Sequence, residues 1–300
     1  MARLLDVLRT GDWLTRERMR LVSLAVLAAS ALGLCFLLLT ADGLNDYQGR
    51  PLGTDFSSFY AAGTYVQDGQ PAMPFDPAAQ HAREQKLFGA ATPFYSWAYP
   101  PFFLFIAAAL ALLSYPVALL VWQGATLLSY LGVTRAILFP SAVPASAPPG
   151  SLRCAEPRSP VSGGTSDHLW LLLALAYPAV LVNVGHGQNG LLSASLLGGA
   201  LVVLDRRPIL AGILIGLLAY KPQFGLMIPI ALVASGRWKT IAAAGVTVMA
   251  LVLATLIAFG PDVWRTFFAS NQFARAALLE TGDIGWHRSE ERRVGKECRL

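Results

Sequence analysis

Apolar residues run along most of the chain in long stretches that short polar segments interrupt. The first stretch, Leu21 to Leu39, contains no charged residue and would be about 28 Å long as a helix, which is enough to cross the hydrocarbon core of a bilayer. We predict that it is the first transmembrane helix. A cleaved signal peptide is the alternative, but the stretch is longer than the apolar region of such peptides and no clear A-x-A site follows it.

Seven further apolar stretches follow, several of them short for a full crossing, and we expect about seven or eight spans in all. If each were a crossing, two basic turns, at Arg206-Arg207 and at Arg237 with Lys239, would lie on the wrong side of the membrane. We therefore expect the stretch after the Tyr99-Pro100-Pro101 corner to be re-entrant or incomplete. The seven stretches are 101–113, 117–139, 169–184, 191–204, 209–220, 224–234 and 241–259.

Charge along the chain predicts its orientation. Five arginines precede the first helix, so the positive-inside rule places residues 1–20 in the cytoplasm and the segment from about 41 to 98 outside. That outer segment has six acids and three bases, which agrees. Within it, 56–67 and 77–88 are predicted as short helices along the interface. The Pro/Ser/Gly-rich segment 140–167 is predicted as a cytoplasmic linker.

The composition supports this membrane assignment. The chain has 55% hydrophobic and only 14% charged residues, against about 25% charged residues in a typical soluble domain, and its mean hydropathy is +0.51. The fold class expected is all-α, a polytopic transmembrane helical bundle with a long first extracytoplasmic loop. The formal charge of +5 does not indicate nucleic acid as a partner, because the Lys and Arg residues are scattered among short loops.

Cysteine and histidine positions argue against a disulfide framework or a protein-built metal site. Cys35, Cys154 and Cys298 lie far apart, and the four histidines are dispersed. The end of the chain is a separate matter. The charged stretch from Arg288 to Arg299 breaks abruptly from the apolar sequence before it and resembles the translation of a sequencing-adapter sequence, so we predict that 288–300 is a non-native tail.

One carboxylate and two polar turns stand out on the predicted outer side. Asp55 lies in the run GTDFSSFYAAG, which begins at Gly53. The turns are 185–190 and 220–223, and the second contains Lys221. Because the helices beside Lys221 are only about 12 residues each, roughly 18 Å, this lysine is expected below the membrane surface in a protein-lined cavity, where a cation is a candidate functional residue.

These motifs, in this order, resemble the polyprenyl-phosphate-sugar-dependent glycosyltransferases of the GT-C superfamily. The nearest resemblance is to the bacterial alpha-mannosyltransferases of glycosyltransferase family 87 (DUF2029), and it covers about residues 20 to 280. One departure is that Phe75-Asp76 stands where the family has a YD pair. The motifs are GTDFSSFYAAG, DGQP at 68–71, FDP at 75–77, YPP at 99–101, GQN at 187–189, AGILIG at 211–216 and KP at 221–222.

The resemblance implies a GT-C-like domain over 21–287 that transfers a hexose, with mannose expected, from a polyprenyl-phosphate donor to an extracytoplasmic glycolipid or glycan acceptor. It implies a multi-pass protein of the bacterial plasma membrane. Transfer needs a base for the acceptor hydroxyl and a positive or donor-rich pocket for the departing phosphate. The resemblance places the family's catalytic Asp at Asp55. Lys221 fits the phosphate contact with His186 or Gln188 as helpers, and the further substrate-binding candidates are Asn189, Tyr60, Tyr99 and Asp76.

No cofactor is expected, because the donor carries a single phosphate and no paired acids of the DxD type lie near Asp55, although a divalent ion stays open. The reaction is expected to invert, since one base suffices; a retaining scheme would need a second carboxylate such as Asp76 close by. The rival class is a transporter or lipid-carrier flippase, which also has polar turns at membrane depth. A non-catalytic assembly subunit is the third interpretation.

Each candidate also has a purely structural interpretation. Asp55 and Asp76 are suited to capping helices, as are Gln188 and Asn189. Lys221 could be a snorkelling lysine at the interface, and His186 an exposed turn residue. The aromatic residues at 94, 95, 97 and 99 are typical of a belt at the membrane interface.

Overall fold

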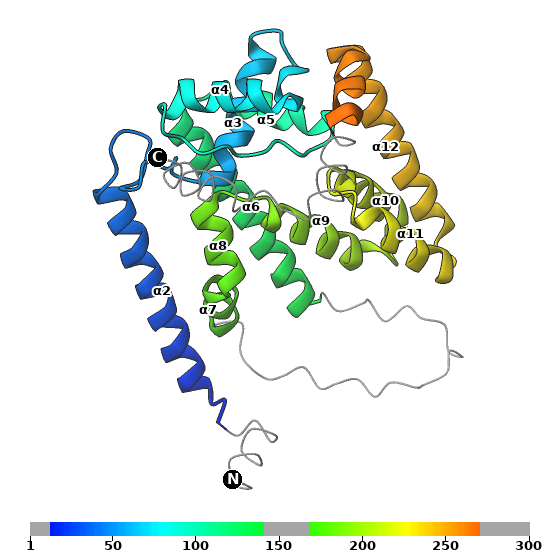
Figure 1. The fold of residues 1–300 in the computed structure, drawn as a ribbon. Coiled ribbons are helices and arrows are strands. Elements are labelled where there is room, and N and C mark those ends of the chain that lie inside the picture. The colour runs from blue at the N-terminus through cyan, green and yellow to red at the C-terminus, as the bar shows by residue number, and fades with distance from the viewer. Residues whose placement is uncertain (1–12, 141–167, 271–300) are drawn as a thin grey trace, which may run out of the picture.

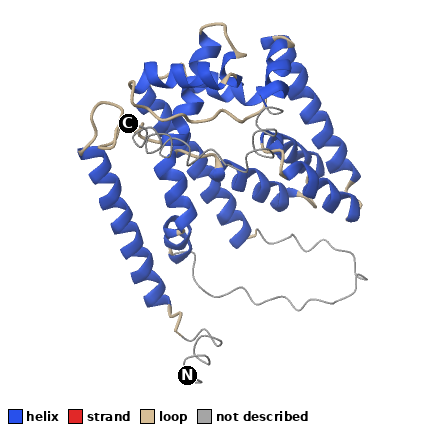
Figure 2. Cartoon of the chain, viewed as in Figure 1, coloured by secondary structure: helices blue, strands red, loops and turns tan. Residues whose placement is uncertain are grey.

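A computed structural model describes residues 13–140 and 168–270 of the chain. These residues are mostly helical and contain no β-strand (Figure 2), which confirms the predicted all-α class. Residues 1–12, 141–167 and 271–300 lie outside the described residues, and with them all but the first residue of the predicted linker 140–167 and the whole predicted tail 288–300.

Helix α2 (Arg16–Leu39) is the predicted first transmembrane helix. Thr15 caps it by accepting a hydrogen bond from the backbone of Arg18 at 3.3 Å. The helix stands at one edge of the molecule (Figure 1) and most of its leucine side chains are exposed. A helix that is apolar on all sides and packs on few neighbours is typical of a lipid-facing span.

The described residues contain three helices that are long and apolar enough to span a bilayer: α2, α6 (Tyr115–Leu138) and α12 (Trp238–Phe259). The pair α7 (Leu169–Ala176) and α8 (Pro178–His186) makes a fourth if it is counted as one bent span. The protein is therefore a polytopic helical membrane protein. By helix length, however, the prediction of seven or eight spans is wrong for the described residues, because the other apolar stretches form shorter helices.

The apolar stretch 169–184 does not form one straight helix, because α7 and α8 are bent by 54° at the break between them. The break lies at Tyr177, whose backbone is extended with φ −63° and ψ 124°. Pro178 explains it, because the proline ring disfavours the helical conformation of the preceding residue and the missing N–H removes a helix hydrogen bond.

The stretch 101–113 forms only the short η2 (Pro101–Phe103) and the seven-residue α5 (Leu104–Leu110), roughly 10 Å long as a helix. The expectation that this stretch is incomplete is confirmed. The remaining apolar helices are also short. They are α9 (Gly190–Val203), α10 (Pro208–Leu217) with η3 (Leu218–Tyr220), and α11 (Phe224–Ala234).

The segment after α2 folds into α3 (Thr54–Gln67), η1 (Met73–Phe75) and α4 (Pro77–Phe88), within two residues of the predicted helix bounds. Together with α5 these helices lie at the top of the view in Figure 1, above α6 and α8. Unlike an interfacial helix, α3 is enclosed, with Phe56 and Phe59 at most 1% exposed. Residues 89–100, which we call the strap, lead from α4 to η2.

Aromatic side chains from the strap fill the core beside α3. Trp97 is only 4% exposed and its ring contacts the ring of Phe59 edge-on, with 6.2 Å between the centroids. Tyr99 stacks on Phe103 at 4.7 Å. The prediction of a membrane-interface belt is therefore wrong for Trp97, because Phe59 offers it an aromatic core.

Helices α10 and α12 pack closely because small residues face each other. A Cβ added to Gly216 would lie 2.6 Å from the Cβ of Thr247, and one added to Gly212 would lie 2.5 Å from the Cβ of Ala243. Small residues at such contacts let helix backbones approach in a membrane, where apolar burial alone gives little driving force.

We predict that Gly216→Leu separates α10 from α12 and lowers stability by about 1–3 kcal/mol, as overpacking does. Gly245→Leu is the matched control, because Gly245 lies on α12 with no atom within 4 Å of an added Cβ. Thermal unfolding in detergent measures the difference, and equal midpoints for the two variants would contradict the close packing.

Candidate functional site

Asp55 lies in the first turn of α3, one residue after the helix begins. The N-cap is Gly53, in the left-handed conformation with φ +71°, and no side chain caps this helix end. The interpretation of Asp55 as the N-cap is therefore wrong. A carboxylate in the first turn is favoured by the helix dipole, and its side chain is left free for contacts outside the helix.

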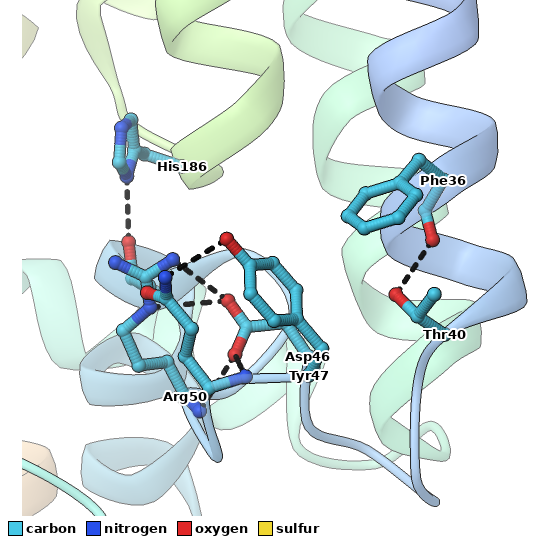
Figure 3. A network of polar contacts seen from close by, with 8 residues as sticks. Phe36, Thr40, Asp46, Tyr47, Arg50 and His186 are labelled. Atoms are coloured by element: carbon cyan, nitrogen blue, oxygen red, sulfur yellow. Dashed lines mark hydrogen bonds and ion pairs between the residues drawn. The ribbon is translucent and has the colours of Figure 1, made fainter.

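The turn after α8 meets Asp55 and its neighbour. Gln188 donates a hydrogen bond from Nε2 to Oδ2 of Asp55, across 133 residues of sequence. Beside it, the Thr54 hydroxyl and Nδ1 of His186 lie 2.7 Å apart, and Figure 3 shows His186 reaching from the end of α8 toward this contact. Three candidates that the sequence singled out are thus brought together.

Two glycines allow this approach. Gly187 has φ +66°, and a Cβ added there would lie 2.6 Å from the Cβ of Phe56 on α3. A Cβ added to Gly53 would lie 2.8 Å from Cδ1 of Leu119 on α6. A larger residue at either position would therefore strain the backbone, and at Gly187 it would also push the turn away from α3.

Helix α6 holds both segments in place. Trp122 donates from Nε1 to the carbonyl of Gly187 at 3.0 Å, and Gln123 donates from Nε2 to the carbonyl of Val184 at 2.7 Å. The Tyr115 hydroxyl donates to the carbonyl of Leu52 at 2.5 Å, just before α3. Sequence reasoning missed these residues. The signal that could have indicated them is Gln123, because a polar amide inside an apolar span needs a partner there.

Capping of α9 falls to a residue that the sequence did not indicate. Oδ1 of Asn183 accepts a hydrogen bond from the backbone of Leu191 at 3.2 Å. Asn189 occupies the N-cap position without a side-chain cap bond, and Gln188 contacts Asp55 instead. The interpretation of Gln188 and Asn189 as caps is therefore wrong, and their amides are left for other contacts.

Asn189 and Tyr99 extend the site inward. Asn189 is 4% exposed, and its Nδ2 forms no hydrogen bond of ordinary geometry with the described residues. Its amide lies beside the Tyr99 hydroxyl. Burial raises the pKa of Tyr99 to about 12, Asn189 opposes this rise, and the charge of Asp55 adds to it. The phenol of Tyr99 is thus a neutral hydroxyl within electrostatic reach of Asp55.

Lys221 lies at the inner end of this group. The Tyr220 hydroxyl is 2.8 Å from the Ser193 hydroxyl and 3.4 Å from the carbonyl of Asn189. Lys221 follows Tyr220, and its Nζ is 5.9 Å from the centre of that ring. Among the described residues the half-buried Lys221 has no ion pair, so it does not pair with Asp55. Its relation to the site is through the chain: Tyr220, which precedes it, contacts the carbonyl of Asn189, which follows Gln188.

Two other candidates have structural contacts. The Tyr60 hydroxyl donates to the carbonyl of Leu113 at 2.9 Å, which ties α3 to the segment that follows α5. Asp76 is exposed and caps α4, accepting from the backbone of Ala78 at 2.9 Å. Its interpretation as a helix cap is confirmed, and no contact joins it to Asp55 in the described residues.

An ion pair lies next to the site in the loop before α3 (Figure 3). The guanidinium of Arg50 donates from Nε and Nη2 to Oδ2 of Asp46 at 3.0 and 2.9 Å. Burial alone raises the pKa of Asp46, but hydrogen bonds from Arg50 and Gln48 outweigh it and hold this pKa below its usual value. The charges of Arg50 and Asp55 both act on the phenol of Tyr95, so all three lie in one region.

The fold and the site define a polytopic helical membrane protein with a carboxylate held against a polar turn at one end of the bundle. Residues 97–288 match the model of glycosyltransferase family 87, so the chain belongs to that family and is a glycosyltransferase with a sugar donor and an acceptor as substrates. The match includes the turn at 185–190 and Lys221 but not Asp55. No curated protein and no solved structure matches the chain.

No group of three or more His, Cys, Asp or Glu side chains in the described residues is placed to hold a metal ion. The expectation that no metal is needed stays a prediction.

We predict that Gly187→Ala destabilises the protein by about 1–3 kcal/mol, because a Cβ there overlaps Phe56 and left-handed φ is costly for alanine. Gly185→Ala is the control, two residues away with open space around an added Cβ. Thermal unfolding in detergent measures both variants. Equal unfolding midpoints for Gly187→Ala and Gly185→Ala would contradict the close approach of Gly187 to Phe56.

Proposed function

We propose that this glycosyltransferase moves a hexose, with mannose expected, from a polyprenyl-phosphate donor to a glycolipid or glycan acceptor, with Asp55 as the general base. The observation that carries the proposal is the contact between Asp55 and Gln188. It joins the two polar segments that the sequence marks as candidates, although 133 residues separate them. A lone carboxylate oriented by an amide suits removal of a proton from an incoming hydroxyl.

The geometry around Asp55 suits this role. Gln188 engages Oδ2, and Oδ1 has no hydrogen-bond partner among the described residues. Oδ1 would accept the proton of the acceptor hydroxyl as its oxygen attacks the anomeric carbon. The bond between that carbon and the phosphate oxygen breaks, and the phosphate leaves with the electron pair. Because one base suffices and Asp76 is occupied at the start of α4, we propose inversion at the anomeric carbon.

The departing phosphate needs positive charge and hydrogen-bond donors. Lys221 supplies an ammonium group with no ion pair in the described residues, and Asn189 supplies a buried Nδ2 without a partner of ordinary geometry. His186 and Gln188 lie on the other side of Asn189 along the same turn. We propose that Lys221 and Asn189 bind the phosphate and that Tyr99 contacts the sugar. Since the donor has a single phosphate, we propose that no divalent cation is required.

The arrangement of basic residues supports an extracytoplasmic site. In Figure 1, α2 and α12 both begin at the end of the molecule away from α3, α4 and α5. Arg237 precedes α12 and pairs with Asp205 in the turn between α9 and α10, so two basic turns lie together. By the positive-inside rule that end faces the cytoplasm. We propose a bacterial plasma-membrane protein with a cytoplasmic amino terminus and Asp55 on the outer side.

We predict that Asp55→Asn lowers transfer by about 10²- to 10⁴-fold, the usual contribution of a general base, while folding is kept because the Asn carbonyl can still accept from Gln188. Membrane vesicles containing the full chain are incubated with radiolabelled polyprenyl-phosphate mannose, and release of label from the donor is followed. Asp76→Asn is the control, since Asn also caps helices well. Undiminished transfer by folded Asp55→Asn would exclude the proposed base.

We predict that Lys221→Gln raises the donor KM at least tenfold, because a charge-assisted contact to phosphate is lost, with a typical contribution of about 1.5–3 kcal/mol. Lys239→Gln is the control, because Lys239 is an exposed lysine near the start of α12. Initial rates over a range of donor concentrations separate KM from kcat. A donor KM that matches the control would remove Lys221 from the phosphate site.

A further inference from the structure

Glu84 is a fully buried carboxyl group that the transfer chemistry does not use. It lies on α4 and is 0% exposed. No lysine or arginine of the described residues pairs with it, whereas its neighbour on the same helix, Arg83, pairs with Asp68 at 2.6 Å. A buried carboxyl group without a cation is costly, so its hydrogen bonds must hold it in place.

Those hydrogen bonds join three segments. Oε2 of Glu84 accepts from the backbone N–H of Tyr95 in the strap at 3.0 Å. Oε1 accepts from Nε2 of Gln80 at 3.2 Å, and the same Nε2 donates to the carbonyl of Ser58 on α3 at 3.2 Å. Glu84 is thus the point at which α4 holds the strap against the helix that carries Asp55.

The strap carries two phenols within electrostatic reach of Asp55, and one of them, Tyr99, packs edge-on against Phe59 of α3 with 5.2 Å between the ring centroids. Burial raises the pKa of Tyr95 to about 12, and the charges of Asp46, Asp55 and Glu84 add to this rise while Arg50 opposes it. Tyr99, four residues further along the strap, is also within reach of the charge of Asp55. If the strap moved, both phenols would leave the neighbourhood of Asp55.

We propose that Glu84 is a positioning residue for glycosyl transfer, which anchors the strap through the backbone of Tyr95 and so keeps Tyr99 packed on α3, the helix that carries Asp55, where the strap phenols bind the donor sugar. The proposal rests on the proposed function, in which Asp55 marks the reaction site. Glu84 does not touch the substrate. It contributes by fixing the position of the strap side chains that contact the substrate in this proposal.

The anchor also has a predictable response to pH. Burial raises the pKa of Glu84 to about 7 from 4.5, and the bonds from Tyr95 and Gln80 oppose this rise only partly. The groups that face it are Tyr95 from the strap and Gln80 from its own helix, with Ser58 of α3 behind Gln80. Glu84 therefore holds its proton more tightly when the strap is in place than when the strap has moved away and the carboxyl is solvated. Movement of the strap away from α4 consequently becomes easier as pH rises from 4.5 through 7.

The test compares Glu84→Ala with Glu84→Gln in the full-length protein. Alanine leaves the N–H of Tyr95 without its acceptor, so we expect amide hydrogen exchange in the strap to rise roughly tenfold and the donor KM to rise by a similar factor, with a smaller change in kcat. Glutamine keeps an oxygen for that N–H, so it should restore both values to within about threefold of wild type. Lys86→Ala, an exposed change on the same helix, is the control.

The rate of amide hydrogen exchange in the strap, corrected for the pH dependence of intrinsic exchange, should increase from pH 5 to pH 8 in wild type and stay constant in Glu84→Gln. This arm keeps the proposal testable if Glu84→Ala does not fold. Wild-type exchange in Glu84→Ala, equal loss in both variants, or no pH difference between wild type and Glu84→Gln would overturn it. Strap exchange does not depend on Asp55, so a failure of the base assignment, seen with Asp55→Asn, is distinguishable from a failure of the anchor.

Discussion

The structure depends on one close contact, in which the turn after α8 packs against the first turn of α3. Gly187 makes it possible, because an added Cβ would lie 2.6 Å from the Cβ of Phe56. Gln188 can then donate to Asp55, and His186 can lie against Thr54. The chemistry that we propose follows from this contact, since without it Asp55 would be a surface carboxylate in a helix turn and the amides at 188 and 189 would have no site to serve.

The polar groups around this contact have partners inside the protein, as a membrane requires. Helix α6 contributes Trp122 and Gln123 to the carbonyls of the turn. On the other side, Glu84 and Gln80 fasten the strap to α3. Two groups used in the proposed function are exceptions among the described residues: the buried Nδ2 of Asn189 has no partner of ordinary geometry, and Lys221 has no ion pair.

The sequence predicted the local features well. The bounds of α3 and α4 follow within two residues from apolar runs and from start signals such as Asp76-Pro77, whereas α2 begins at Arg16, five residues before the predicted apolar run. The charges on the turns led to the expectation that the stretch 101–113 is incomplete, and it forms only short helices. It also selected Asp55, His186 and Gln188, which the structure brings together. The meeting of segments that lie 61 to 133 residues apart has no local signal.

Four features therefore escaped sequence reasoning. The contacts of Trp122 and Gln123 and the anchor at Glu84 are fixed only when distant segments pack, and Glu84 looks like an ordinary acid on an exposed helix. The candidate spans in the described residues are fewer than expected because four of the apolar stretches form helices of 10–17 residues, which are short for a full crossing. Capping by Asn183 was missed because a cap eight residues before its partner leaves no sequence pattern.

The most direct measurement is a cross-link between positions 54 and 186 in native membranes. Cysteines replace Thr54 and His186 in a chain whose own three cysteines are serine, a protease site is placed within residues 141–167, and a short bis-thiosulfonate reagent is added. We expect the two proteolytic fragments to stay joined until a reductant is added, while a control pair at positions 54 and 235 gives separate fragments. Separate fragments from the 54–186 pair would contradict the contact on which the site depends.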